Sequence, residues 1–505
     1  MLSWLTNYSV MNIKYSAFCI VFFFVQACAP VNESTKENNQ KPNIILIVVD
    51  DQGYADYEPF DNHDPQVVNP HISALARSGI TFTQAYTTAP VCSPSRVGIL
   101  TGKNQFRWDK NASWGPGLPD SVKTIAEYLH DSGYATARIG KSDLGRNFHK
   151  YNVREYPLEH GYDEFLGFSA HAHDYWLLSK DIRDRTKDPK GTSAVLGPLM
   201  HNDGEKSYEE GYLTDILTDE GIRYIEKERI KPFFLTLAYS AVHHLIHEVP
   251  QKYLDKYNVL PIANYDPDSL LAYGKHEAGS YLAYYDKYSR HGAIKDADMR
   301  NYYLANLNCL DDNIGRIMSA IKKKNIEKET LIIYISDNGG SPLTGANNTP
   351  LTGGKYSLWE GGIRVPMSMS WPGRIESNQT QDEYVSATDI LPTISAAAGI
   401  KLTDSTIDGI DLLQPDDDRL LVWKWQKTWA VRRGDWKLTN SNENHWKGTP
   451  NSLYIKPISD ELTLKLFDLS KDPGEREDLA NKYPQRVAEL RNAYEKWMMT
   501  NVGQF

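Results

Sequence analysis

The stretch that sets the fold class of this chain is Asn43-Ile44-Ile45-Leu46-Ile47-Val48-Val49, followed by Asp50-Asp51. A continuous apolar, β-branched run of this length is typical of a strand that is buried on both faces. Such strands occur in parallel sheets, because crossover helices cover both faces of a parallel sheet. The stretch therefore predicts an α/β fold, with a large mixed, mostly parallel sheet that is flanked by helices.

Similar patterns continue along the chain. Further strands are predicted at residues 80–86, 134–139, 232–239 and 331–336. Helices are predicted at 69–79, 121–133, 212–229, 300–324 and 389–398. From residue 403 the chain turns polar, and the remainder indicates a small sheet with one helix at about 484–499. We expect a large domain over residues 42–402 and a small α+β C-terminal subdomain over residues 403–505.

Oxygen-bearing side chains stand directly after two of the predicted strands. Asp50 and Asp51 follow the first strand, and Asp337 and Asn338 follow the strand at 331–336. Ligands of α/β sheets gather at the carboxyl ends of strands. The Asp-Asp pair alone fits a solvated turn equally well. All four residues together favour a hard divalent cation, calcium first and magnesium second, because zinc prefers nitrogen or sulfur.

The loop Pro90-Val91-Cys92-Ser93-Pro94-Ser95-Arg96 places a cysteine among small polar residues, and an apolar run follows. The run predicts that the loop leads into a helix. A thiol at a helix N-terminus beside a guanidinium lies where negative charge is favoured. For an isolated cysteine, a free thiol in a turn is the ordinary alternative. Whether Cys92 has a functional role must therefore be judged from the residues around it.

That string, continued by Leu100-Thr101-Gly102, resembles the signature of type I sulfatases. Gly353–Pro366 resembles the second signature of the same family, and the similarity runs from Asn43 to the end of the chain. The resemblance implies an alkaline-phosphatase-like fold and a sulfuric ester hydrolase. It also implies that a formylglycine-generating maturation enzyme oxidises Cys92, and that the hydrate of the resulting aldehyde is the nucleophile.

The resemblance also implies roles for individual side chains. Lys141 and Lys355 would bind sulfate as point charges. Arg96 would favour ionisation of the hydrate, and His243 would contact the sulfate and protonate the leaving sugar oxygen. One calcium ion would be held by Asp50, Asp51, Cys92, Asp337 and Asn338.

The stretch Gly140-Lys141-Ser142-Asp143-Leu144-Gly145 departs from the family, which usually has a histidine where this chain has Asp143. In relatives that histidine helps the hydrate to collapse back to the aldehyde. Three outcomes are open: Asp143 is the base, another histidine takes the role, or turnover is impaired. The candidate histidines are His149, His171 and His173.

Three histidines, His243, His244 and His247, follow the strand at 232–239. Three imidazoles at the mouth of a sheet also fit a zinc site. We favour the family role for His243, with His244 and His247 lining a sugar pocket.

The N-terminus is typical of an export signal. Its apolar run, Ala17–Val25, is too short for a permanent membrane span. Val25-Gln26-Ala27-Cys28 resembles a bacterial lipobox, which would make residues 1–27 a lipoprotein signal peptide, Cys28 a lipidated residue and residues 28–41 a tether. An uncleaved anchoring helix is the alternative. We expect an exported protein, lipid-anchored to a bacterial membrane at the periplasm or cell surface, with no other membrane contact.

The composition narrows the partners. The net charge of −10 argues against nucleic acid, and the four cysteines form no disulfide framework if Cys28 and Cys92 have these roles. Cys309 is expected to be a buried apolar residue. The expected substrate is a sulfated carbohydrate, with algal glycans such as ulvan favoured and glycosaminoglycans also open. The alternatives are a phosphonate or phosphate ester hydrolase of the same superfamily and an inactive glycan-binding lipoprotein, which the Asp143 departure motivates.

Overall fold

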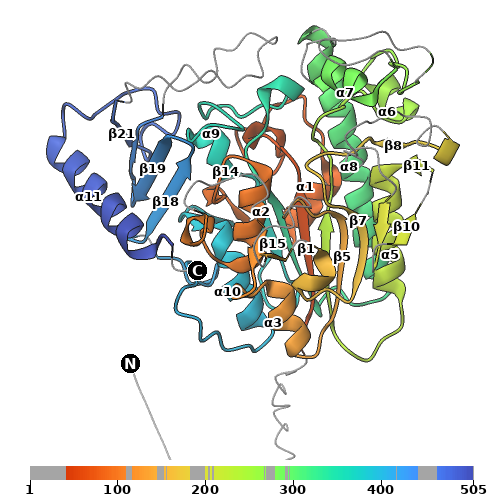
Figure 1. The fold of residues 1–505 in the computed structure, drawn as a ribbon, viewed down its shortest axis with the longest axis horizontal. Coiled ribbons are helices and arrows are strands. Elements are labelled where there is room, and N and C mark those ends of the chain that lie inside the picture. The colour runs from red at the N-terminus through yellow and green to blue at the C-terminus, as the bar shows by residue number, and fades with distance from the viewer. Residues whose placement is uncertain are drawn as a thin grey trace, which may run out of the picture. The chain divides into compact units, whose positions relative to one another are not determined.

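A central sheet of ten strands forms the middle of the protein in its computed structural model (Figure 1). The structure describes residues 41–109, 117–144, 153–154, 156–181, 199–202, 205–207, 210–266, 268, 279–289, 294, 296–416, 418–441 and 463–503. The strand order is β10-β9-β7-β5-β12-β1-β13-β15-β2-β16. The bounds are β1 Asn43–Val49, β2 Ile80–Phe82, β5 Ala135–Lys141, β7 Glu164–Phe168, β9 Leu199–His201, β10 Glu205–Ser207, β12 Phe233–Ala238, β13 Thr330–Ser336, β15 Met367–Ser370 and β16 Gln379–Gln381.

Strand β1 lies between β12 and β13, and both of its neighbours run parallel to it. β5 and β7 extend the parallel block, whereas β9, β10, β15 and β2 join by antiparallel pairing. The predicted mixed, mostly parallel sheet is therefore confirmed. Val48 aligns with Ala238 of β12, and Val49 aligns with Ser336 of β13. The residues that follow these three strands therefore emerge at one edge of the sheet.

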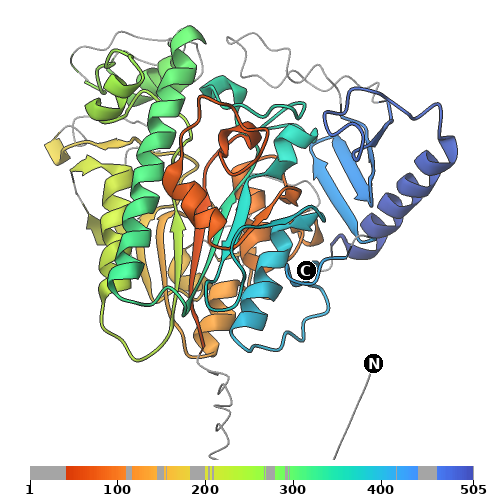
Figure 2. The ribbon, with the colours of Figure 1, turned by 180° about the vertical axis from the view of Figure 1, so that it is seen from behind.

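Helices cover both faces of the sheet. Ile45 and Ile47 of β1 share a core with α1 (Pro70–Arg77), α5 (Leu213–Glu226) and α8 (Asp296–Lys323), which lie toward the viewer in Figure 2. Ile44 and Leu46 point to the opposite face. There they share a core with α2 (Cys92–Thr101), α3 (Ile125–Asp131) and α10 (Ile390–Ala397), which face the viewer in Figure 1. The apolar run of β1 is thus buried on both sides, as its sequence predicts.

The predicted strand at 80–86 is wrong as one element, because the chain leaves the main sheet at Thr83 and Gln84. Thr83 N–H still bonds to Gln381 O of β16 at 3.0 Å, but Gln84 O already accepts from Val385 N–H of the small sheet at 2.9 Å. The next two residues form β3 (Ala85–Tyr86), which pairs with β14 (Arg364–Val365) and β17 (Val385–Ser386) in a separate small sheet. This step carries the chain toward Cys92.

The C-terminal part contains a four-stranded antiparallel sheet and one long helix, as predicted. The sheet comprises β18 (Leu420–Trp425), β19 (Thr428–Arg433), β20 (Trp436–Thr439) and β21 (Lys465–Asp468), and α11 (Pro484–Asn501) packs on it. Trp423 packs in one cluster with Tyr86 and Leu358 of the larger part. The boundary at residues 402 and 403 remains a prediction.

Two helices, α6 (Gln251–Lys256) and α7 (Tyr281–Ser289), lie in the segment between β12 and α8. Cys309 is buried in α8, as expected. The predicted signal peptide, the lipidated Cys28 and nearly all of the tether lie outside the described residues. Within the ranges that the structure describes, none of the helices has the length and apolar content needed to cross a membrane.

Candidate active site

The predicted site residues come together at the carboxyl ends of β1, β12 and β13. Asp50 and Asp51 follow β1, His243 follows β12, and Asp337 and Asn338 follow β13. Lys141 ends β5, Cys92 and Arg96 lie on α2, and Lys355 comes from the loop before α9 (Glu360–Ile363). All of these side chains are buried. The carboxyl ends of four neighbouring strands, the start of α2 and one loop thus bring together residues from Asp50 to Lys355.

Cys92 is the first residue of α2, and Val91 caps the helix with an extended backbone. Its Sγ atom lies 3.1 Å from Lys355 Nζ and 3.5 Å from Asp50 Oδ1. Burial raises the pKa of the thiol well above its usual range, and the charge of Asp50 raises it further. The expectation that this site favours a thiolate is therefore wrong for the protein without a metal. Arg96 does not change this, because its guanidinium binds Asp337 at 2.8 Å.

Asp50 and Asp51 are each held by a lysine. Lys141 Nζ donates to Asp50 Oδ2 at 2.6 Å, and Lys355 Nζ donates to Asp51 Oδ2 at 2.8 Å. Burial alone would raise the pKa of Asp50, but the charges of Lys141, Arg96 and Lys355 together lower it. At Asp51 the effect of burial prevails and its pKa is raised. The two neighbouring carboxylates therefore differ in how firmly they hold their charge.

Asp337 and Asn338 complete the acidic side of the site. Burial, together with the charge of Asp50, raises the pKa of Asp337 to about 7. Asn338 Nδ2 donates to Asp51 Oδ1 at 2.7 Å, while Asn338 Oδ1 is buried without a hydrogen-bond partner. An orphaned carbonyl oxygen beside three buried carboxylates is the donor set that a hard cation requires. The residues present therefore fit the predicted calcium ion.

His243 lies against the same carboxylates, with its Nε2 3.7 Å from Asp51 Oδ2. Burial, and then the charge of Lys355, lowers the pKa of His243 well below its usual value. The imidazole is therefore neutral here. Its nearest histidine is His244, with ring centroids 4.2 Å apart, and His244 in turn faces Tyr285.

His247 points away from this group. Its Nε2 lies 2.8 Å from the hydroxyl of Tyr284 on α7, and burial lowers the pKa of His247 to about 3. Within the described part of the chain, no group of metal-type ligands contains His244 or His247. The three-histidine zinc alternative is therefore not assembled, and the proposed place of His247 in a sugar pocket gains no support.

Asp143, the residue in the usual histidine position, lies at the site. It is buried, its Oδ2 is 3.4 Å from Lys141 Nζ, and its backbone is left-handed with φ of 49°. Of the alternative histidines, His173 pairs with Asp174 at 2.6 Å, and His171 packs edge-on against Tyr285. His149 lies outside the described residues.

Glu248 is a buried residue that the sequence reasoning missed. It accepts hydrogen bonds from Tyr175 N–H at 2.7 Å, Trp176 N–H at 3.3 Å and the Tyr284 hydroxyl at 2.7 Å. It thereby joins the loop before β8 (Trp176–Leu177), the His243 loop and α7. The only sequence signal was a carboxylate five residues after His243, in a loop of histidines and apolar residues.

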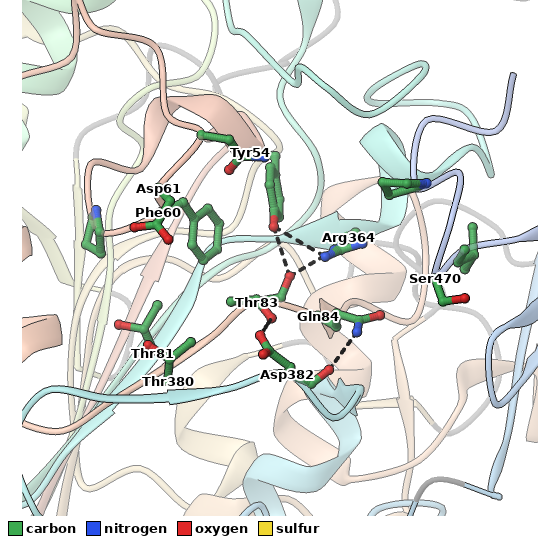
Figure 3. Close-up of a pocket in the computed structure, with 14 residues that line it drawn as sticks. Tyr54, Phe60, Asp61, Thr81, Thr83, Gln84, Arg364, Thr380, Asp382 and Ser470 are labelled. Carbon is green, nitrogen blue, oxygen red and sulfur yellow. Dashed lines mark hydrogen bonds between the residues drawn. The ribbon is translucent and has the colours of Figure 1, made fainter.

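A separate pocket of about 360 Å³ lies between strands β2 and β16, at the side of the main sheet, and residues 469–473 of the C-terminal part (Figure 3). Tyr54 and Arg364 line its centre in this view, with Thr83 and Asp382 below them. Ser470 lies at the right, across the pocket from Phe60. The Tyr54 hydroxyl donates to Thr83 O at 3.0 Å, and Arg364 Nε donates to the same oxygen at 2.9 Å. Among the predicted site residues that the structure describes, none lines this pocket.

The site can now be compared with known proteins. Residues 42–400 match the family described as "Sulfatase", and residues 354–501 match "N-sulphoglucosamine sulphohydrolase, C-terminal". N-acetylgalactosamine-6-sulfatase of Mus musculus is 28% identical over 479 residues, which cover 86% of this chain and 82% of that protein. Arylsulfatase J of Mus musculus is 26% identical over 517 residues, covering 93% of this chain and 78% of that protein.

Solved structures have a similar overall fold. That of Ps i-CgsB is 28% identical with a TM-score of 0.73, and covers 92% of this chain and 94% of that one. The same protein has been solved in complex with k-i-k-neocarrahexaose, at 27% identity and a TM-score of 0.72. The residues of the family match, 42–400, include all members of the buried cluster.

Proposed function

Because this chain belongs to the sulfatase family and is a sulfuric ester hydrolase, we propose that it removes sulfate from a sulfated polysaccharide by means of a formylglycine made from Cys92. The observation that carries this proposal is the contact of Cys92 with Lys355 and Asp50, inside a buried cluster that fits a hard cation. Burial suits the reaction, because charges act more strongly where water is excluded.

The proposed metal is one calcium ion at Asp50, Asp51, Asp337, Asn338 and residue 92. When bound, it would polarise the sulfate oxygens toward attack at sulfur. The formylglycine hydrate would provide the attacking hydroxyl.

The proposed roles of the cationic side chains follow from their positions. Lys141 and Lys355 now neutralise Asp50 and Asp51, and a bound cation would free both ammonium groups to hold sulfate oxygens. His243 donates the proton that the leaving sugar oxygen needs. An anionic sulfate would oppose the charge of Lys355, which is one cause of the low pKa of His243. Substrate binding would thus favour the protonated imidazole.

We assign to Asp143 the role of the base that takes the proton from the second hydroxyl and so releases sulfate. Its buried Oδ2, which has no hydrogen-bond partner and lies 3.4 Å from the ammonium of Lys141, supports this role. Asp143→Asn should slow sulfate release after the first turnover, and Asp143→His should restore it. A steady-state rate unchanged in Asp143→Asn would contradict the role.

For the substrate we favour an algal glycan of the carrageenan type, because the structure of Ps i-CgsB holds a neocarrahexaose and matches this chain along 92% of its length. Ulvan and glycosaminoglycans are the other candidates, the latter suggested by the N-acetylgalactosamine-6-sulfatase relatives. The protein would reach such polymers as an exported lipoprotein anchored through Cys28. Incorporation of a radiolabelled fatty acid, lost in Cys28→Ala, tests the anchor.

The first experiment is mass spectrometry of the peptide that contains residue 92, on protein produced together with a formylglycine-generating enzyme. We expect the mass change of thiol-to-aldehyde conversion, and calcium-dependent sulfate release from carrageenan, ulvan or glycosaminoglycan fragments. Faster turnover of p-nitrophenyl phosphate or phosphonate than of the sulfate would favour the ester-hydrolase alternative. Full conversion with no release from any ester would favour a glycan-binding protein.

A further inference from the structure

The side chains nearest to Cys92 form a donor set that differs from the one suited to calcium. Asp50, Asp51, Cys92 and His243 each place one ligand atom within 4.8 Å of all the others, and all four residues are buried. The set contains two carboxylate oxygens, one sulfur and one imidazole nitrogen. Calcium prefers oxygen ligands alone, whereas zinc is commonly bound by this mixture.

The spacing of these atoms also suits zinc. Cys92 Sγ lies 3.5 Å from Asp50 Oδ1, and His243 Nε2 lies 3.7 Å from Asp51 Oδ2. Ligands bound tetrahedrally at normal zinc distances are separated from one another by roughly 3.4–3.6 Å. Two edges of a tetrahedron are therefore nearly in place.

The surroundings hold the two carboxylates in a form that can bind a metal. Lys141 binds Asp50 through Oδ2 and leaves Oδ1 facing the thiol. Asn338 binds Asp51 through Oδ1, and Lys355 lies against both oxygens, at 2.7 Å from Oδ1 and 2.8 Å from Oδ2. Asp51 Oδ2 also faces His243, so a cation bound there would take the place of the Lys355 ammonium. Such outer contacts orient ligands and increase metal affinity.

We propose that the protein with an unconverted Cys92 binds one zinc ion at Asp50, Asp51, Cys92 and His243. A zinc–sulfur bond forms, the S–H bond breaks and the proton passes to solvent. Conversion of Cys92 to formylglycine replaces sulfur with oxygen, so the same pocket changes from a zinc site to a calcium site. The inference rests on the proposed function only for this second state.

The test uses the full chain produced without the maturation enzyme and freed of metal. Titration should show that one equivalent of zinc binds here and releases a proton. Cobalt in its place should give thiolate-to-metal absorption in the near ultraviolet and the visible bands of tetrahedral cobalt. A second group of three ligands, His71, Asp311 and Asp312, contains no sulfur. The near-ultraviolet absorption therefore distinguishes the two groups.

Two variants and a matched control identify the ligands. Cys92→Ser should abolish the thiolate absorption. His243→Gln should weaken zinc binding by more than about tenfold, since loss of an outer-shell partner alone costs about that much. His244→Gln changes the neighbouring histidine and should keep the affinity, and thermal unfolding will show whether each variant is folded.

Cobalt bound without thiolate absorption would overturn the proposal, as would equal zinc affinity in wild type and Cys92→Ser. The outcome is independent of the sulfatase test. Failure of zinc binding leaves sulfate release by the converted protein unaffected, and failure of sulfate release leaves the zinc measurement intact.

Discussion

Lys355 illustrates how much one residue can decide at this site. Its ammonium lies 2.7 Å from Asp51 Oδ1 and 3.1 Å from Cys92 Sγ, so it contacts both a predicted metal ligand and the predicted nucleophile. Burial opposes the charge of Lys355, but the carboxylate of Asp51 outweighs it and the pKa of Lys355 is raised well above its usual value. The side chain is therefore a positive charge at neutral pH.

Lys355→Met keeps the length of the side chain and removes the charge. We expect kcat/KM for sulfate release to fall about 100-fold or more, the cost typical of losing one preorganised electrostatic contact. Steady-state kinetics on the converted protein measure it. Lys401→Met, at an exposed lysine, is the control and should leave kcat/KM unchanged. A loss below about threefold in Lys355→Met would show that Lys355 does not hold sulfate.

Glu248 leads to a second prediction at the level of single residues. In Glu248→Ala, the N–H groups of Tyr175 and Trp176 lose their acceptor in a buried setting. Buried donors without partners cost about 1–3 kcal/mol each, so we expect a clear fall in melting temperature. Glu248→Gln retains an acceptor oxygen and should lose less. Equal melting temperatures for wild type and Glu248→Ala would show that the two loops are held by other contacts.

Among the elements, α2 is placed by a close approach at Gly98. A side-chain carbon there would lie 2.3 Å from Thr88 Oγ1, on the segment that leads from β3 to the helix. A side chain at residue 98 would therefore force the helix or its lead-in to shift. Because Cys92 and Arg96 lie on the same helix, this packing also sets where both side chains point.

Gly98→Ala should therefore destabilise the protein, even though alanine is the better helix former. Overpacking of this kind costs about 1–3 kcal/mol, measured as a lower melting temperature. Gly315→Ala in α8 is the matched control, because the carbon would meet the ring of His71, an exposed side chain that can turn away. A larger loss in Gly315→Ala than in Gly98→Ala would contradict this account.

The elements also show what could be predicted from sequence. Strand β1 and the residues after it were predictable, because a strand buried on both faces needs an unbroken apolar run and its end is where ligands gather. The break after Phe82 was not, because it depends on the pairing of Ala85 and Tyr86 with β14 and β17, strands about 280–300 residues away. The raised pKa of Cys92 was likewise hidden, since it comes from burial and from Asp50, which only the fold brings near.

At the scale of the whole molecule, a buried charge network joins the catalytic and C-terminal parts. Lys437 of β20 lies 2.9 Å from Glu360 of α9 and 2.9 Å from Glu475, and all three side chains are buried. Burial raises the pKa of Glu475 to about 7, with Glu360 adding to the effect. The pKa of Glu360 is lowered instead, because Lys437, Arg364 and Arg432 outweigh its burial.

This network predicts a pH dependence of stability. The folded protein holds a proton on Glu475 up to a pH near 7, whereas an unfolded glutamate loses it near 4.5. The folded state therefore binds more protons between these values, and the free energy of unfolding falls as pH rises, by on the order of 2 kcal/mol. The melting temperature of Glu475→Gln minus that of wild type should therefore rise between pH 5 and pH 7. A constant difference would contradict the prediction.

Cys92 is 1% exposed at the start of α2, and this burial limits when an enzyme could modify its side chain. A macromolecular catalyst cannot reach a sulfur atom that is enclosed by the ends of β1 and β13. If Cys92 is converted to formylglycine as proposed, the oxidation would have to take place before the nascent polypeptide folds, and maturation would compete with folding. Molecules that fold first would keep their thiol, so slower folding should raise the yield of converted protein.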